Sequence, residues 1–213
     1  MRNIILITLI SAITFLSCNK KIEPPKEESY FPVESLYKDV TFHEFILDIQ
    51  KQVSNIQDIQ TFRNYIGDGQ LSEYETSNIH RIFGYTDKDL FWKDQTLQNN
   101  RLLDLNKNYD LKNITESQKR KAVEKAFVTL NLFSQPSTTD TNQMLVADIC
   151  ERIRLNCLAS VLAEATIMHM ACASMDITVV LGLLCHGAAF TYQITTSNNC
   201  NLEAIRCKDS ITQ

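Results

Sequence analysis

The last 64 residues contain six of the seven cysteines of the chain, and an even number of thiols can be oxidised in pairs. These cysteines are Cys150, Cys157, Cys172, Cys185, Cys200 and Cys207. Successive cysteines are separated by 6, 14, 12, 14 and 6 residues, so the spacing is the same in both directions. Residues seven positions apart lie two turns apart on one face of a helix. The spacing therefore favours an antiparallel helical hairpin centred near residue 178.

Symmetric positions of such a hairpin meet, which favours the nested disulfides Cys150–Cys207, Cys157–Cys200 and Cys172–Cys185. Six cysteines allow fifteen pairings, and spacing alone does not select one of them. Residues 174–176 are typical of a helix start, which would shift the turn and bring Cys172 and Cys185 out of line. Residues 195–199 are typical of a helix break, so the second arm is expected as one helix or two.

A zinc site is the alternative chemistry for part of this region. His169 and Cys172 lie three residues apart, and Cys185 precedes His186, which together could supply a Cys2His2 ligand set. Adjacent residues of a helix point in different directions, and oxidation competes for both thiols. We therefore expect no metal or other cofactor, and interpret the two histidines as half-buried neighbours of a disulfide.

Other reactive patterns are incomplete. The stretch 68–75 resembles the second half of an EF-hand loop, but Ile66 occupies a loop position that needs an oxygen ligand. The chain contains no Gly-x-Ser-x-Gly elbow, and Gly67 and Gly69 form only a fragment of a phosphate-binding loop. An enzyme with a dispersed acidic site remains the least favoured hypothesis, and a non-catalytic protein is expected.

The elements that would position these residues are helices. Five glycines and four prolines in 213 residues are few turn formers, which argues against a β-sandwich. Capping-box patterns begin at Thr41, Ser72 and Thr115, and acidic residues after Thr86 mark a fourth helix start. We expect helices near 42–63, 73–83, 87–108 and 116–133. The expected buried stripes are Phe45, Ile49, Val53, Ile56 and Ile59 in the first helix, and Leu97, Leu102, Leu105 and Tyr109 in the third.

The polar stretch 136–142 is the clearest internal linker. It separates a cysteine-free helical domain, 34–135, from a cysteine-rich helical domain, 143–213. The predicted fold is all-α, with a helical N-terminal region followed by a disulfide-stapled C-terminal helical hairpin. Residues 177–194 contain no Asp, Glu, Lys or Arg and reach the lower limit for spanning a bilayer. We interpret them as a buried core helix, with a membrane-inserting hairpin as the alternative.

The N-terminus has the layout of an export signal. Arg2 precedes the apolar stretch 4–16, which ends in Leu16-Ser17-Cys18. This layout resembles the lipobox of bacterial lipoproteins. The resemblance implies that residues 1–17 are a signal peptide and that Cys18 carries diacylglycerol and an N-linked acyl chain such as palmitate. An ordinary signal peptide ending in Cys is the alternative.

Residues 18–33 would then be the lipidated cysteine and a flexible tether, because charges and paired prolines cannot bury a core. The chain is mildly acidic, with a formal net charge of -4, which gives no electrostatic case for nucleic acid. We expect a protein held by its N-terminal lipid in the cell envelope, facing the periplasm or the surface at the outer membrane. The expected role is binding or scaffolding of another envelope protein. The alternative is a membrane-active toxin, or its immunity partner, acting through the apolar hairpin.

Overall fold

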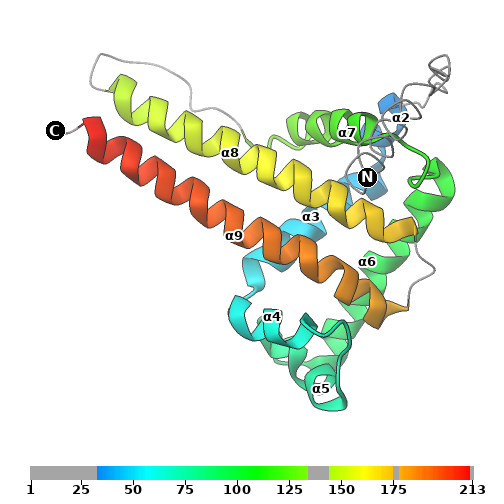
Figure 1. The fold of residues 1–213 in the computed structure, drawn as a ribbon. Helices are drawn as coiled ribbons and strands as arrows, with labels where there is room; N and C mark the ends of the chain where they lie inside the picture. The colour runs from blue at the N-terminus through cyan, green and yellow to red at the C-terminus, as the bar shows by residue number, and fades with distance from the viewer. Residues whose placement is uncertain (1–32, 134–143, 175–177, 212–213) are drawn as a thin grey trace, which may run out of the picture. The chain divides into compact units, whose positions relative to one another are not determined.

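The computed structural model describes residues 33–133, 144–174 and 178–211, and in these ranges the secondary structure is entirely helical (Figure 1). The helices are α2 Val33–Lys38, α3 Val40–Asn55, α4 Ile59–Ile66, α5 Glu73–Ile82, α6 Lys88–Tyr109, α7 Glu116–Thr129, α8 Met144–Ala171 and α9 Val179–Ile211, with a 3-10 turn at Cys172–Ser174. The predicted all-α class is confirmed. The predicted signal peptide, all but the last residue of the tether, and the linker 136–142 lie outside the described residues.

Two helices begin at the capping boxes that the sequence predicts. The hydroxyl of Ser72 accepts a hydrogen bond from the Glu75 amide at 3.2 Å, and the Glu75 carboxylate accepts one from the Ser72 amide at 2.8 Å. Thr115 and Gln118 exchange the equivalent bonds at the start of α7. Each box satisfies two amides that have no partner within the helix, so α5 and α7 start where local chemistry alone predicts.

Three other helix starts differ from the prediction because an aspartate caps each helix. Asp39 accepts from the amide of Thr41 at 2.7 Å, so α3 starts ahead of the predicted Thr41 box. Asp58 caps α4 and accepts from the Thr61 amide at 2.9 Å, which divides the helix expected at 42–63. Asp87, not Thr86, caps α6. A carboxylate accepts amide hydrogen bonds and also stabilises the positive end of the helix.

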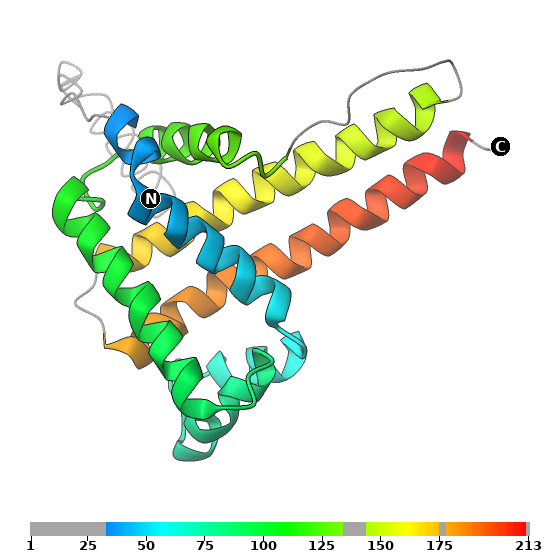
Figure 2. The same cartoon turned by 180° about the vertical axis from the view of Figure 1, so that it is seen from behind.

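The long helices α8 and α9 form an antiparallel hairpin (Figures 1 and 2). Disulfides join Cys150 to Cys207, Cys157 to Cys200 and Cys172 to Cys185, with Cα–Cα distances of 5.7, 5.7 and 5.9 Å. This is the nested pairing, and the predicted stapled hairpin is confirmed. The predicted break at 195–199 is wrong, since α9 continues to Ile211. The Thr195 hydroxyl donates to the Thr191 carbonyl at 2.8 Å, so this polar side chain is satisfied within the helix.

Removing the outer disulfide with Cys150→Ala and Cys207→Ala should lower the free energy of unfolding by about 3 kcal/mol. The sequence separations of the outer and middle bonds are 57 and 43, so with the middle bond intact the outer one closes only 14 further residues. A loop of that size gives the chain-entropy value above. Guanidinium denaturation of the oxidised protein, followed by circular dichroism, measures the difference. A variant with an unchanged midpoint and slope would contradict the expectation.

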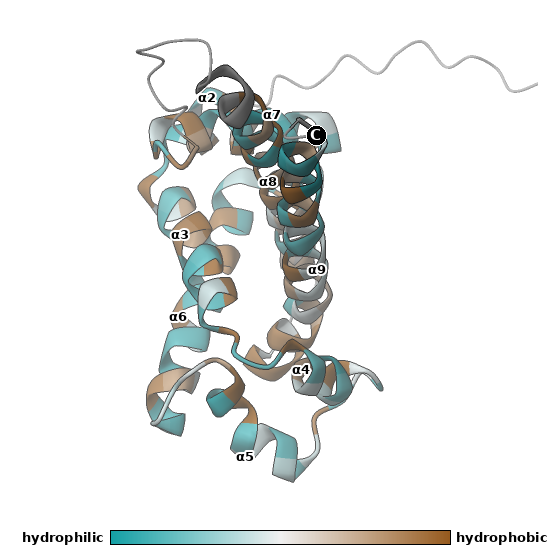
Figure 3. Ribbon diagram, turned by 90° about the vertical axis from the view of Figure 1, so that its left-hand side faces the viewer, coloured by the Kyte–Doolittle hydropathy of each residue, from teal (hydrophilic) through white to brown (hydrophobic). Residues whose placement is uncertain are grey.

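The helices of both stretches predicted as separate domains pack together, and Pro32–Gln213 forms one compact unit. Helix α7 packs on α8, while α4 and α6 pack on α9. Phe190 of α9 lies between the two stretches, with its ring 6.3 Å from that of Phe62 and 5.9 Å from that of Phe83. Figure 3 shows hydrophobic and hydrophilic residues on different sides of individual helices. The apolar sides of both stretches are buried against one another, which is why they share a core.

Candidate functional site

One end of the hairpin extends past the helices that cover the rest of it (Figures 1 and 2). We call this part the arm, residues 149–158 of α8 and 196–210 of α9. Few of its described side chains are buried, and two of the three disulfides lie in it. Arg154 adds an ion pair to Glu151 and a hydrogen bond to Asn201 across the hairpin. Covalent bonds therefore hold the arm together where its apolar core is small.

A groove of about 490 Å³ lies between α7 and α8. On the α7 side it is lined by the apolar Phe127, Val128 and Phe133 and by the polar Arg120, Glu124 and Asn131, and the side chain of Val128 is 82% exposed. On the α8 side it is lined by the small residues Ala159, Ser160 and Ala163, together with Asn156. Small side chains allow another backbone to approach closely. The groove therefore combines an apolar patch and charged residues on the α7 side with small residues on the α8 side.

The exposed apolar residues on the α8 half of the arm lead toward this groove. Ile149, Ile153, Asn156, Ser160 and Ala163 follow each other at intervals of four, three, four and three residues, which places them on one side of α8. Ile149 and Ile153 are each 45% exposed. The same spacing continues to Ile167 and Met170, which are buried. This side of α8 is thus covered at one end and uncovered at the arm.

The sequence reasoning did not identify this surface, although its signal is present. The heptad-like spacing from Ile149 to Met170 is visible in the sequence. It is interrupted by Asn156 and Ser160, so apolar residues alone do not reveal it. The opposite wall comes from α7, which the sequence does not place beside α8.

The chain matches no protein-family model, no curated protein and no solved structure.

The residues of the zinc alternative are brought together, but in a different arrangement. Cys172 and Cys185 are bonded to each other, so neither thiolate is free for a metal. His169 and His186 are buried and share a hydrogen bond between their Nδ1 atoms at 2.8 Å. Within the described ranges no group of three or more His, Cys, Asp or Glu is placed to hold a metal ion. The expectation that these histidines are half-buried is wrong, because both lie in the core.

Burial determines the protonation of this histidine pair. It lowers the pKa of His169 well below its usual value, with the neighbouring His186 acting in the same direction. It lowers the pKa of His186 to about 4. Both rings are therefore neutral at pH 7, and one Nδ1–H donates to the other Nδ1. The ring of Phe190 lies 4.7 Å from that of His169, so the pair belongs to the shared core.

The apolar stretch 177–194 lies mostly in the first half of α9. Its Leu183, Ala189 and Phe190 are buried, as expected for a core helix. Among the described residues, α9 is the helix that is long and apolar enough to span a membrane by length and composition. Gly187 marks a close approach, because a Cβ at this position would lie 2.6 Å from Cδ1 of Ile66. This part of α9 is therefore fitted against α4 rather than left uncovered.

Proposed function

We propose that this protein is a lipid-anchored component of the bacterial cell envelope that binds an amphipathic helix of another envelope protein. The helix would lie in the groove between α7 and α8 and continue along the exposed side of the arm. The observation that supports this is the heptad-spaced side of α8, which is covered at Ile167 and Met170 and open at Ile149 and Ile153. A helix with apolar residues at intervals of three and four fits such a surface.

The covalent design of the hairpin supports a binding role. A surface that is already held in its bound conformation loses little entropy when a partner docks. The disulfides hold the arm in this way, and they require an oxidising compartment. Export through the lipobox-like N-terminus would supply that compartment, and the lipid at Cys18 would keep the groove near the membrane. The intact mass of the mature protein tests the anchor directly.

A photo-crosslinking amino acid placed at Val128 or Ile153 tests the groove in cells. Both positions should give one discrete adduct, and the crosslinked peptide of the partner should have apolar residues at helical spacing. Leu202 is the matched control, since it is exposed and apolar like Ile153 but belongs to α9, away from the side of α8 that leads from Ile149 to the groove. Equal adducts from all three positions, or none from Val128 and Ile153, would count against the proposal.

Ile153→Asp should weaken binding of the captured helix at least about tenfold, because it places a charge in an apolar contact. Ile153 is half exposed, so the fold should tolerate the change. Titration of the purified variant with the partner peptide measures the affinity, and Leu202→Asp serves as the control. Unchanged affinity for Ile153→Asp would contradict the proposed contact.

The alternative function is that of a membrane-active toxin or its immunity partner, and the length and composition of α9 favour it. Insertion would require Leu183 and Phe190 to leave the core they share with α4 and α6. Dye release from liposomes by the oxidised full-length mature protein distinguishes the two functions. Leakage at micromolar protein would support a toxin, and intact liposomes would remove the membrane-active form of the alternative.

A further inference from the structure

The side of α8 that leads toward the groove is complementary to a second copy of itself. It begins with the large side chains of Ile149 and Ile153, continues with Asn156 and ends with the small residues Ser160 and Ala163. Asn156 stands in the middle of this series, seven residues from each end, which is two helical turns in each direction. Large exposed side chains on one half therefore match small, groove-lining side chains on the other half.

An antiparallel second copy would bring each half of the series against the other half. With a two-fold axis at Asn156, Ile149 of one copy faces Ala163 of the other, and Ile153 faces Ala159. The same contacts then form twice, because a two-fold interface joins identical surfaces. Both isoleucines of each copy would enter the groove of the other copy, next to its apolar α7 side.

The position of Asn156 on this axis explains why a polar residue interrupts the series. Asn156 is exposed, and in the antiparallel pair its side chain would meet that of its own symmetry mate. A side-chain amide carries both a donor and an acceptor, so two amides related by a two-fold axis can exchange two hydrogen bonds. In coiled coils a single asparagine in an apolar seam fixes the register and the number of helices. The interruption is therefore the residue that would set the register.

The charges beside the series are complementary in the same arrangement. Glu124 lines the groove and is exposed, and within the described ranges it forms no ion pair. The cation that lines the groove, Arg120, is already paired with Glu164. Arg152 lies four residues before Asn156, on the same side of α8. In the antiparallel pair the guanidinium of Arg152 would reach the groove of the other copy, where the carboxylate of Glu124 lies.

We propose that, in the absence of a partner, two copies of this protein pair through this side of α8, so that each arm fills the groove of the other copy. Three features fit this single antiparallel arrangement: the large and small halves of the series, the central asparagine and the opposite charges. The inference rests on the proposed function, because it uses the same groove, and a partner helix would displace the second arm. The pairing covers Ile149 and Ile153, which are each 45% exposed in the single chain.

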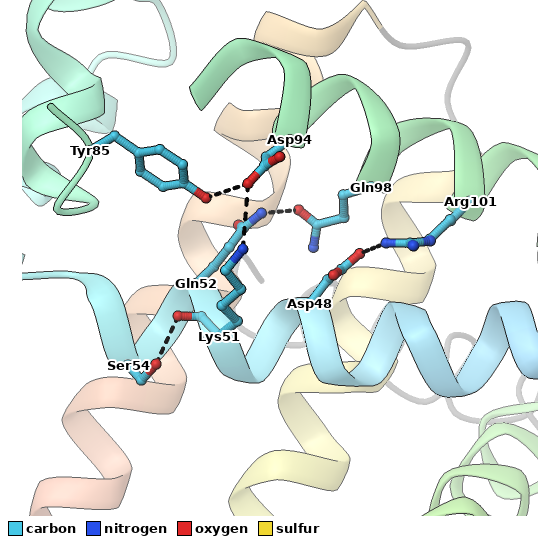
Figure 4. Close-up of polar contacts among 8 residues, drawn as sticks. All are labelled: Asp48, Lys51, Gln52, Ser54, Tyr85, Asp94, Gln98 and Arg101. Atoms are coloured by element: carbon cyan, nitrogen blue, oxygen red, sulfur yellow. Dashed lines mark hydrogen bonds and ion pairs between the residues drawn. The ribbon is translucent and has the colours of Figure 1, made fainter. Parts of the chain in front are cut away.

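An exposed apolar residue elsewhere provides the control. Leu97 of α6 is 49% exposed and borders the polar side chains that lie between α3 and α6. These polar side chains contact one another: Arg101 pairs with Asp48, and the hydroxyl of Tyr85 donates to Asp94 at 2.7 Å (Figure 4). Leu97 is not among the residues that line the groove, so a charge at this position should not affect the pairing.

Sedimentation equilibrium of the oxidised mature protein, in a detergent matched to the solvent density, tests the proposal. We expect an equilibrium between monomer and dimer with a Kd of about 1–100 µM. Asn156→Asp and Asn156→Lys should each weaken the dimer about tenfold or more, because each places two like charges on the axis. An equimolar mixture of the two variants should dimerise again, since opposite charges then meet. Leu97→Asp should leave the Kd unchanged.

The mixture makes the test specific to a two-fold axis at Asn156. Recovery on mixing also shows that both variants are folded. A wild-type protein that stays monomeric up to about 1 mM, unchanged dimers in both single variants, or a mixture that stays monomeric would overturn the proposal. A monomer whose Val128 and Ile153 still crosslink to a different protein would remove this inference and leave the proposed function standing. A dimer that captures no other protein in cells would do the reverse.

Discussion

Replacing Phe190 by Ala should lower the free energy of unfolding by about 3–5 kcal/mol, the cost of removing a large aromatic side chain from a closed core. Phe190 has no exposed surface. Its ring faces those of Phe62 and Phe83 from the N-terminal helices and that of His169 from α8. No single small movement can fill a space bordered by three helices and a turn, so most of the cavity should remain.

The loss of stability in the Phe190→Ala variant should be uneven across the molecule. The disulfides keep α8 and α9 joined whatever happens to the core, so the variant should mainly loosen the contact of α4 and α6 with α9. Guanidinium denaturation gives the total loss, and hydrogen exchange of α4 and α6 amides gives its location. Leu202→Ala on the same helix is the control; this residue is 50% exposed and should change stability by less than about 0.5 kcal/mol. Equal losses in the two variants would show that Phe190 does not join the two stretches.

The features that sequence reasoning predicted well are those set by short-range chemistry. The capping boxes at Ser72 and Thr115 depend on residues three positions apart, so they are visible without tertiary information. The hairpin follows from the symmetry of the cysteine spacing. The short helix α2 was not predicted, and the helix expected from 42 onward was assigned a wrong start because Asp39 lies upstream of the capping box.

The buried side of α6 shows why pattern reading fails for long-range structure. Leu97 was expected in the core but is 49% exposed. The buried positions are Phe91, Gln95, Gln98, Leu102 and Leu105, a heptad-like series that includes two glutamines. A search for apolar residues discards such positions. The Oε1 of Gln98 accepts a hydrogen bond from Gln52 of α3, and the sequence does not show that α3 and α6 are neighbours.

The same limit applies to the candidate binding groove. It needs α7 beside α8, which the sequence does not show. It joins residues that are separated by roughly 25 to 40 positions in the chain. Composition indicated that the protein is helical, but only the packing of the helices brings Asp48 near Arg101 or Phe127 near Ala163.

Acidification should destabilise the protein between about pH 6.5 and pH 4, and the buried histidine pair should be a principal cause. The pKa of both rings is lower in the folded protein than in the unfolded chain. The unfolded state therefore binds more protons as the pH falls through this range, and stability falls with it. For His186, a shift from 6.5 to about 4 corresponds to about 3 kcal/mol. His169 acts in the same direction, because it is enclosed in the same core.

The measurement is the guanidinium midpoint between pH 7.5 and pH 5, where most carboxylates remain ionised and contribute little to the slope. The double variant His169→Leu/His186→Leu has no titratable side chain at either position, so the guanidinium midpoint should depend much less on pH in this range. The loss of the hydrogen bond between the rings should cost little, because both partners are removed together. His43→Gln is the matched control, because His43 lies on α3 outside the shared pair, and it should keep most of the wild-type slope. A double variant as pH-sensitive as the wild type would contradict the prediction, and the acid response would then have to come from groups outside this pair.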